Sequence, residues 1–284
     1  MKLWIIYSKA VLNPSKNNAL SWMLDEAEAL GFDATILFAD DLLLETSGSD
    51  YKIYNKDTEL EYPEAALIRC YDIPLIRHLE MAGVQTFNSS FALNQCLDKW
   101  TTHQLLAKAG LPSPRSIYSE HDVEYETIKK QLSLPFIIKD IKGARGEQVY
   151  LITDELTFSE ALIKCRQPLF QEYIETSFGR DVRLHVIDDQ VVASVLRQSK
   201  GDFKSNFSQG GDALPYEPDD EMKALAIKST QALGLYFSGI DILFTEQGYT
   251  VCEVNGIPGF RTVGLTSKYN IPQAMMAYIR RQLK

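Results

Sequence analysis

The first third of the chain alternates short apolar runs with stretches of helical periodicity. The apolar runs have the length of buried strands and cover residues 3–8, 35–38, 65–70 and 84–87. Apolar residues at helical spacing mark residues 15–30, which end before Gly31, and residues 74–82. Strands and helices that alternate in this way predict βαβ units and a parallel sheet covered by helices. No G-x-G-x-x-G follows the first run, so dinucleotide binding by this part is not expected.

The rest of the chain predicts more strands, several of them antiparallel. Residues 46–63 are polar, with a small hairpin predicted about Asn55-Lys56-Asp57. Residues 89–110 predict one helix that Ser89 or Ser90 can cap and that Gly110 ends. Strands are predicted at 135–141, 148–153, 169–174, 181–187 and 190–197, and helices at 157–165, 219–233 and 271–283.

Residues 239–260 predict a hairpin that carries acidic side chains. Two apolar runs flank Glu246-Gln247-Gly248, which suits a three-residue loop with Gly248 in the left-handed conformation. Such a loop pairs Asp241 with Glu253 and places Asn255 on the same face. A two-residue loop would shift the register by one and separate the two carboxylates. The alternative is that both are unrelated strand-end residues that face solvent.

Two carboxylates at opposed positions of a hairpin need a positive partner. At a separation of about 5 Å they repel by roughly 3 kcal/mol at an effective dielectric constant of 20. Carboxylate and amide oxygens are ligands that Mg²⁺ prefers, together with water and phosphate. Asp241, Glu253 and Asn255 are therefore the predicted metal ligands.

The composition is that of a globular protein with two or three domains. The chain has 284 residues, of which 45% are hydrophobic and 24% charged. Its net charge of −9 argues against a general binder of nucleic acid or anionic membranes. The four cysteines are scattered, no H-E-x-x-H occurs, and no apolar run reaches 18 residues. We expect a cytoplasmic protein with free thiols, no membrane partner and no nucleic-acid partner.

Basic residues cluster in elements that could hold phosphates. Lys139 lies in an apolar run, where it is either a surface lysine or a cation directed at a ligand. The following loop has Gly143 and Gly146 for close backbone approach, and Lys142 and Arg145 for charge, without the Walker spacing.

Further cations stand at Arg183, Arg197 and Lys204. Cations for phosphates and carboxylates for a metal suit a Mg²⁺–polyphosphate site. No activated protein nucleophile is visible, and phosphoryl transfer needs none. The residues alone thus predict an enzyme that uses ATP and Mg²⁺.

A series of short motifs in a fixed order makes the chain resemble the ATP-grasp superfamily and, within it, the RimK-like carboxylate–amine ligases. The motifs are Asn88-Ser-Ser, Leu97-Asp-Lys-Trp, Ile137-Ile-Lys139, Gln171-Glu-Tyr-Ile, Gly179-Arg-Asp-Val-Arg183, Arg197-Gln, Gly201-Asp-Phe-Lys-Ser-Asn206, Gly210-Gly211, Gly239-Ile-Asp241 and Glu253-Val-Asn255 through Pro258-Gly259. The resemblance implies an α/β (α+β) protein with the ATP-grasp fold. It implies a Rossmann-like N-terminal domain (1–95), a central lid domain (96–171) and a C-terminal antiparallel-sheet domain (172–284), with ATP between the last two.

The resemblance also implies roles for single residues. Those expected to bind the nucleotide are Lys99, Lys139, Lys142, Gly143, Arg145, Gly146, Glu172, Tyr173, Asp181, Lys204, Ser205 and Asn206. Arg197 and Arg183 are expected near the transferred phosphoryl group. Asp241, Glu253 and Asn255 would hold Mg²⁺, with two ions expected and Mn²⁺ as an alternative. The alternative for each residue is that it has no functional role; Lys99, for example, could be a solvated lysine on a helix.

The function implied is amide formation from a carboxylate and an amine through an acylphosphate. An amino acid such as glutamate would be added to a protein tail, a peptide or a small molecule. Arg261 is our candidate for a substrate carboxylate, with Arg69 and Tyr71 lining the acceptor side. The alternatives are an ATP-binding regulatory module and an ATP-grasp small-molecule kinase.

The sequence departs from the family pattern at Arg145, at Gly256-Ile257 and at Phe260-Arg261-Thr262. The last two stretches lie near the expected amino-acid pocket, so they bear on substrate choice. A homo-oligomer is compatible with the resemblance.

Overall fold

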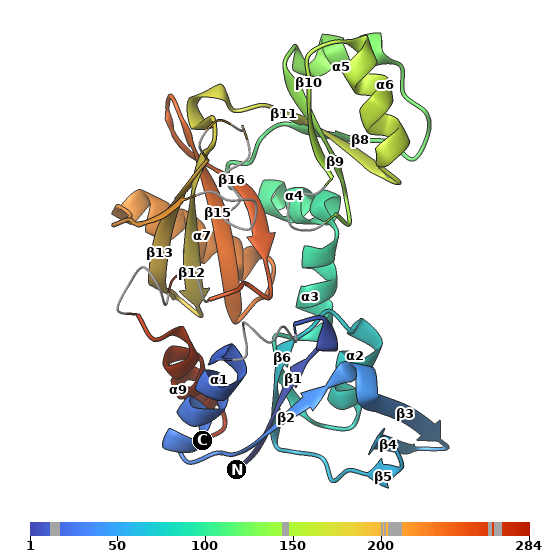
Figure 1. Cartoon of the computed structure of the whole chain (residues 1–284), viewed down its shortest axis with the longest axis vertical. Coiled ribbons are helices and arrows are strands. Elements are labelled where there is room, and N and C mark those ends of the chain that lie inside the picture. Colours follow the sequence, from blue (N-terminus) through green and yellow to red (C-terminus); the bar gives the residue numbers. More distant parts are fainter. Residues whose placement is uncertain are drawn as a thin grey trace.

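The computed structural model describes residues 1–11, 18–143, 148–199, 201, 203, 212–260, 263 and 269–284. The fold is mixed α/β and, within these residues, contains four sheets. Figure 1 shows three bodies: a parallel sheet near both termini, a separate middle sheet, and a C-terminal antiparallel sheet. Among the described residues, no helix combines the length and the apolar character needed to cross a bilayer.

The N-terminal sheet is parallel, as predicted, in the order β2-β1-β6-β7. Its strands are β1 (Lys2–Tyr7), β2 (Asp33–Phe38), β6 (Ala65–Arg69) and β7 (Gln85–Phe87), and its helices are α1 (Asn18–Ala29) and α2 (Ile73–Met81). β1 and β6 are almost fully buried, which explains their uninterrupted apolar runs.

A small antiparallel sheet projects from this body (Figure 1). It consists of β3 (Leu42–Ser47), β4 (Asp50–Asn55) and β5 (Thr58–Glu59). Pairing of Asn55 with Thr58 confirms the hairpin predicted about Asn55-Lys56-Asp57. The preceding hairpin between β3 and β4 was not predicted from the sequence.

The single helix predicted for residues 89–110 is wrong, because two helices occupy this stretch. They are α3 (Ser90–Leu97) and α4 (Lys99–Lys108). Asp98 between them has an extended backbone, and its carboxylate accepts a hydrogen bond from Thr101 N at 2.8 Å. It is the N-cap of α4, so the chain starts a second helix where the apolar periodicity continues unbroken. Lys99 is consequently the first residue of α4.

The middle sheet has its own core. The strand order is β10-β9-β11-β8, and the elements are β8 (Ser116–Tyr118), α5 (Tyr125–Leu132), β9 (Phe136–Asp140), β10 (Val149–Ile152), α6 (Glu155–Lys164) and β11 (Pro168–Glu172). Phe136, Phe158 and Phe170 pack together with Ile128 inside this unit. The core is therefore complete without residues from the other two bodies.

The C-terminal sheet is antiparallel in the order β14-β13-β12-β15-β16. Its elements are β12 (Arg180–Ile187), β13 (Gln190–Gln198), β14 (Asp212–Pro215), α7 (Asp220–Ala232), β15 (Phe237–Thr245) and β16 (Gly248–Asn255). Leu184 and Ile240 on one face pack in the same core as Met222 and Ala226 of α7. The opposite face carries the charged side chains of Arg183 and Asp241, and the paired apolar residues Ile187 and Phe237 belong to a second core.

The final helix, α9 (Ile271–Gln282), lies beside α1 at the N-terminal body (Figure 1). Met275, Met276 and Ile279 share a core with Leu3 and Ile5 of β1. The N-terminal and C-terminal bodies are thus joined by common cores, whereas the middle sheet is separate. The domain limits at residues 95 and 171 remain a prediction.

Candidate active site

The acidic hairpin reaches the predicted pairing by a different route. The loop between β15 and β16 has two residues, because Thr245 pairs with Gly248, so the predicted three-residue loop is wrong. The register then shifts between Asp241 and Ile242: Ile242 faces Val251, whereas Asp241 faces Glu253. Cys252 is the extra residue of this β-bulge, and both Cys252 and Glu253 line the same cavity. The bulge restores the opposition that the short loop alone would have destroyed.

The positive charge needed near Asp241 is supplied by two arginines. Asp241 faces Arg183 across β15 and β12, and Arg183 forms a bidentate pair with it, with both N–O distances 2.6 Å. Arg197 donates to Asp241 Oδ2 at 2.7 Å and to both carboxylate oxygens of Asp181 at 2.6 Å. The two predicted catalytic arginines and two predicted ligand-binding aspartates therefore form one network on the open face of the sheet.

Burial makes this network electrostatically strong. Asp241 is 3% exposed, and burial alone would raise its pKa, but Arg183 and Arg197 outweigh that effect and lower the pKa to about 2. Burial lowers the pKa of Arg197, while Asp241 and Asp181 raise it, with a net rise. Asp241 and Arg197 are therefore both charged at neutral pH.

Glu253 and Asn255 complete the predicted metal set. No hydrogen bond to the Glu253 carboxylate is formed within the described part of the chain. Asn255 Oδ1 accepts hydrogen bonds from Tyr71 Oη at 3.1 Å and Ile257 N at 2.9 Å. A carboxylate beside Asp241 that has no hydrogen-bond partner among the described residues, with an amide oxygen two residues further on, suits a hard cation such as Mg²⁺. Asp241 would have to share its oxygens between that ion and the arginines.

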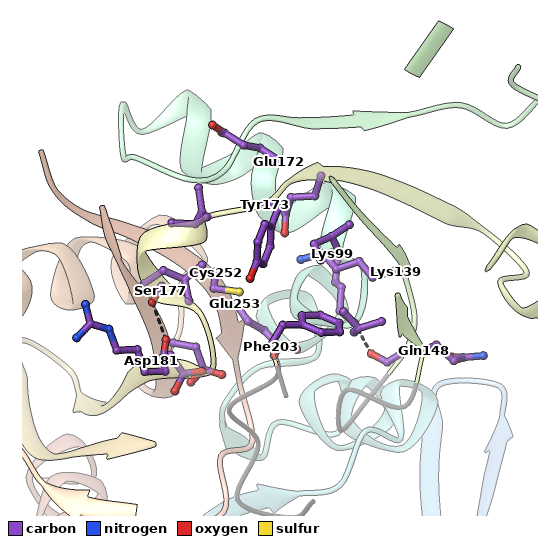
Figure 2. Close-up of a pocket in the computed structure, with 18 of the residues that line it drawn as sticks. Lys99, Lys139, Gln148, Glu172, Tyr173, Ser177, Asp181, Phe203, Cys252 and Glu253 are labelled. Atoms are coloured by element: carbon purple, nitrogen blue, oxygen red, sulfur yellow. Dashed lines mark hydrogen bonds between the residues drawn. The ribbon is translucent and has the colours of Figure 1, made fainter. Parts of the chain in front are cut away.

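A cavity lies between the middle and C-terminal sheets and encloses about 950 Å³, counting the solvent in its open mouth. That size is typical of a small-molecule site. Of the residues predicted to bind ligands, it is lined by Lys99, Lys139, Gly143, Glu172, Tyr173, Asp181, Arg197, Asp241 and Glu253. Figure 2 shows Lys99, Lys139, Tyr173 and Glu253 converging on this space from different elements.

One lysine, Lys99, begins α4, and the other, Lys139, lies on β9 of the middle body. Lys139 on β9 is 5% exposed and has no ion pair with a described residue. Burial lowers its pKa, and neighbouring Lys99 lowers it further. Lys99 donates a hydrogen bond to the Gly143 carbonyl, so the start of α4 is fixed to the start of the glycine-bearing loop. Two close cations that form no ion pair with a described residue are an arrangement that anionic ligands favour.

Asp140 anchors the entrance of that loop. Its carboxylate accepts hydrogen bonds from Lys142 N at 3.0 Å and Arg166 N at 2.7 Å. The side chain of Lys142 is exposed and does not line the cavity. Arg145 and Gly146 lie outside the described residues, as do Lys204, Ser205, Asn206 and Arg261.

The far end of the cavity is formed by the segment after β11. Glu172 is exposed and its carboxylate accepts from Arg115 N at 3.1 Å, so only its backbone side meets the cavity, whereas the Tyr173 ring points inward (Figure 2). Ile137, Ile174 and Leu243 add apolar walls. Apolar walls at one end and charges at the other match the two halves of a nucleotide.

Sequence reasoning missed several residues of this cavity. Gln171 donates to His103 Nε2 at 2.9 Å and to Ser116 Oγ at 2.8 Å, and burial together with Lys139 and Lys99 lowers the pKa of His103 well below its usual value. Cys252 is also a wall residue, and burial raises its pKa to about 11. Only the position of Gln171 beside Glu172 in the sequence could have suggested its role.

Arg69 and Tyr71 do not line the nucleotide-sized cavity. Both reach from the end of β6 to the turn after β16: Arg69 Nη2 donates to Pro258 O at 2.7 Å, and Tyr71 contacts Asn255. They therefore lie between the N-terminal sheet and the predicted substrate turn.

Comparisons with known proteins show the family to which the chain belongs. A family model for the RimK-like ATP-grasp domain matches residues 96–279. A probable alpha-L-glutamate ligase of Klebsiella pneumoniae (strain 342) is 32% identical over 270 residues, which are 91% of this chain and 90% of the relative. The corresponding protein of Legionella pneumophila (strain Paris) is 29% identical over 273 residues, with coverage of 91% and 90%.

Solved structures share the fold over the whole chain. D-cycloserine synthetase DcsG has a TM-score of 0.76 at 14% identity, and each chain is covered to 100%. The ATP-grasp ligase PsnB, complexed with minimal precursor, Mg and ADP, has a TM-score of 0.73 at 20% identity, with coverage of 99% and 98%. With the family model spanning more than half of it, the chain belongs to the RimK-like ATP-grasp family of ATP-dependent carboxylate–amine ligases.

Proposed function

We propose that this ligase joins an amino acid, with L-glutamate as the first candidate, to the carboxylate of a protein tail, a peptide or a small molecule. The curated relatives that match the chain over nine-tenths of its length are named probable alpha-L-glutamate ligases. The observation that carries the proposal is the charge arrangement in one cavity. The cations Lys99, Lys139 and Arg197 line it together with the carboxylates Asp241 and Glu253.

The residues divide the work by position. Lys99 and Lys139 would bind the phosphates, and Tyr173 with the backbone of Glu172 would face the base. Asp241, Glu253 and Asn255 would hold Mg²⁺, which supplies charge compensation when bound, with a second ion and Mn²⁺ as further possibilities for test. Arg197, already at Asp181 and Asp241, would stabilise negative charge that develops on the transferred phosphoryl group.

The overall reaction requires two bond exchanges. A substrate carboxylate oxygen bonds to the γ-phosphorus of ATP and the bond to ADP breaks, which gives an acylphosphate. The amine nitrogen then bonds to the acyl carbon, the carbon–oxygen bond to phosphate breaks, and the nitrogen loses a proton. The chain's own contribution is to position the reactants and to exclude water from the acylphosphate.

A substrate screen tests the proposal. The protein is incubated with ATP, Mg²⁺ and pairs drawn from a panel of amino acids and carboxylates, with release of ADP and phosphate and the mass of new amides as readouts. Release only when both partners are present supports a ligase, and a stable phosphorylated product would instead indicate a kinase. Nucleotide binding without turnover in any pairing would contradict both. Glu253→Gln is the matched inactive control.

A further inference from the structure

Three buried polar atoms that form no hydrogen bond within the described part of the chain lie close together outside the nucleotide cavity. They are Tyr7 Oη, Arg69 Nε and His185 Nε2, each on a residue that is 7% exposed or less. Among the described residues, only His103 Nδ1 is another such side-chain atom. Buried polar groups are nearly always paired, so a cluster of unpaired ones indicates something that the fold alone does not supply.

The strand registers explain why these atoms meet. Tyr7 and Arg69 are paired residues at the carboxyl ends of β1 and β6. His185 on β12 is paired with Gly239 on β15, and a Cβ at Gly239 would lie 2.7 Å from Pro258 Cβ. Because Arg69 donates to the Pro258 carbonyl, the guanidinium lies beside this strand position. The carboxyl ends of parallel strands are where α/β sheets bind ligands.

Arg69 differs from Arg183 and Arg197 in having no anionic partner among the described residues. Arg183 and Arg197 both pair with aspartates, whereas no carboxylate pairs with Arg69 within the described part of the chain. Its other neighbours are Tyr7 and the Phe260 ring, whose centroid is 5.5 Å from the guanidinium carbon. A buried cation without a counter-charge is costly, and a bound anion would offset that cost.

The neighbours favour a carboxylate with further hydrogen-bonding capacity. The Tyr7 hydroxyl can donate, and Arg69 Nε–H can donate in parallel with a terminal N–H, as in Arg–carboxylate pairs. Burial and Arg183 lower the pKa of His185 to about 3, so its imidazole is neutral and Nε2 can donate or accept.

Distance along β12 identifies which carboxylate this is. His185 lies two residues beyond Arg183, the partner of Asp241, which is about 7 Å along a strand. A carboxylate held at Arg69 is thus one strand repeat away from the groups expected at the phosphoryl transfer. We infer that this carboxylate is not the one that ATP phosphorylates. The incoming amino acid carries such a carboxylate, its α-carboxylate, next to its amine.

We propose that Arg69, Tyr7 and His185 form a subsite for the α-carboxylate of the amino-acid substrate. The inference rests on the proposed function, because it assumes an amino acid as the amine. It assigns the N-terminal sheet the task of orienting the amine toward the cavity.

Calorimetric titration of the full chain with ADP and Mg²⁺ tests the subsite without turnover. The ligands are L-glutamate, L-glutamine, which lacks only the γ-carboxylate, and L-isoglutamine, which lacks only the α-carboxylate. Wild type should bind isoglutamine about 10- to 100-fold more weakly than the other two, the range expected for hydrogen bonds to a charged group. Arg69→Gln should remove this difference, and Tyr7→Phe should reduce it about 2- to 10-fold.

Two variants and one kinetic readout separate recognition from structure. Arg77→Gln, an exposed arginine on α2, should leave all three affinities unchanged. Arg69→Lys keeps the positive charge but loses the two parallel N–H donors. Its affinity difference between isoglutamine and the other two ligands should lie between those of wild type and Arg69→Gln. In turnover assays Arg69→Gln should raise the KM of the amino acid and leave kcat at saturation nearly unchanged.

Several outcomes would overturn the subsite. They are equal binding of glutamine and isoglutamine by wild type, no binding of any of the three, or an equal loss of all three in Arg69→Gln. The proposed function fails separately. Binding that depends on the α-carboxylate, without amide formation on any acceptor, would support the subsite and contradict the proposed ligase substrates. Efficient ligation of isoglutamine would support the proposed ligase function and contradict the subsite.

Discussion

Asp241 and Glu253 are paired across one hairpin, yet their substitution should have different effects on stability. Asp241→Asn removes a carboxylate that is bound to Arg183 and Arg197. The shift of its pKa from 3.8 to about 2 corresponds to about 2 kcal/mol. Arg197 keeps Asp181 and Arg183 is partly exposed, so the loss should be about 2–3 kcal/mol, at or below the lower limit of the 3–5 kcal/mol typical of broken buried pairs. The melting temperature should fall by about 4–8 °C or more.

The same shift fixes the pH dependence. A carboxyl whose folded pKa is lowered stabilises the fold above its ordinary pKa and ceases to do so as pH falls through the folded value. The difference in unfolding free energy between wild type and Asp241→Asn should therefore be constant above about pH 5 and shrink between pH 4 and pH 2.

Glu253→Gln is the matched comparison. Glu253 has no hydrogen bond to a described residue, so the unfolding free energy should change by less than about 0.5 kcal/mol, as for substitutions away from buried networks. Both variants should lose turnover. Urea unfolding followed by tryptophan fluorescence, beside the phosphate-release assay, measures both effects. Equal stability of the two variants at pH 7 would refute the reasoning about the arginine network.

Three further predictions concern the cavity and its supporting turn. Lys139→Met should raise the melting temperature, because it removes a buried cation that has no ion pair with a described residue. The same change should weaken ATP binding at least about 10-fold, as measured by calorimetry. A lower melting temperature would contradict this. Gly256→Ala places a Cβ 2.6 Å from Leu93 Cδ2 and should cost about 1–3 kcal/mol in urea unfolding, whereas Gly259→Ala, with open space around it, should be neutral. Chelation of Mg²⁺ by EDTA should stop turnover and leave the melting temperature of nucleotide-free protein unchanged, since arginines already neutralise Asp241; a fall of several degrees would be inconsistent with that pairing.

The sequence predicted the opposition of Asp241 and Glu253 for a reason that was only partly right. The spacing between them is satisfied by a three-residue loop with a regular ladder, or by a two-residue loop with one bulged residue, and the chain uses the second. Residue spacing cannot distinguish these two arrangements, because a cysteine at position 252 is not a residue type that signals a β-bulge. The helix break at Asp98 was missed for a similar reason, since apolar periodicity continues across an N-cap.

The contacts of the site that could not be predicted from the sequence depend on pairing between distant segments. The parallel N-terminal sheet and the antiparallel pair β12–β13 follow from local patterns, and so were predictable. That Arg183 and Arg197 would share Asp241 depends on the register of β12 against β15, strands far apart in sequence. The placement of Arg69 against Pro258 likewise joins residues 189 positions apart, and no local pattern encodes it.

The shared core of β1 and α9 has a consequence for synthesis on the ribosome. Leu3 and Ile5 leave the exit tunnel long before Met275 and Ile279, which pack in the same core, have been made. The middle sheet closes its core from residues within about one-fifth of the chain, so it can fold while translation continues. The N-terminal sheet cannot complete its core until α9 has been synthesised, so its apolar surface stays exposed until then. Nascent chains stalled before residue 271 should therefore engage chaperones through their N-terminal strands.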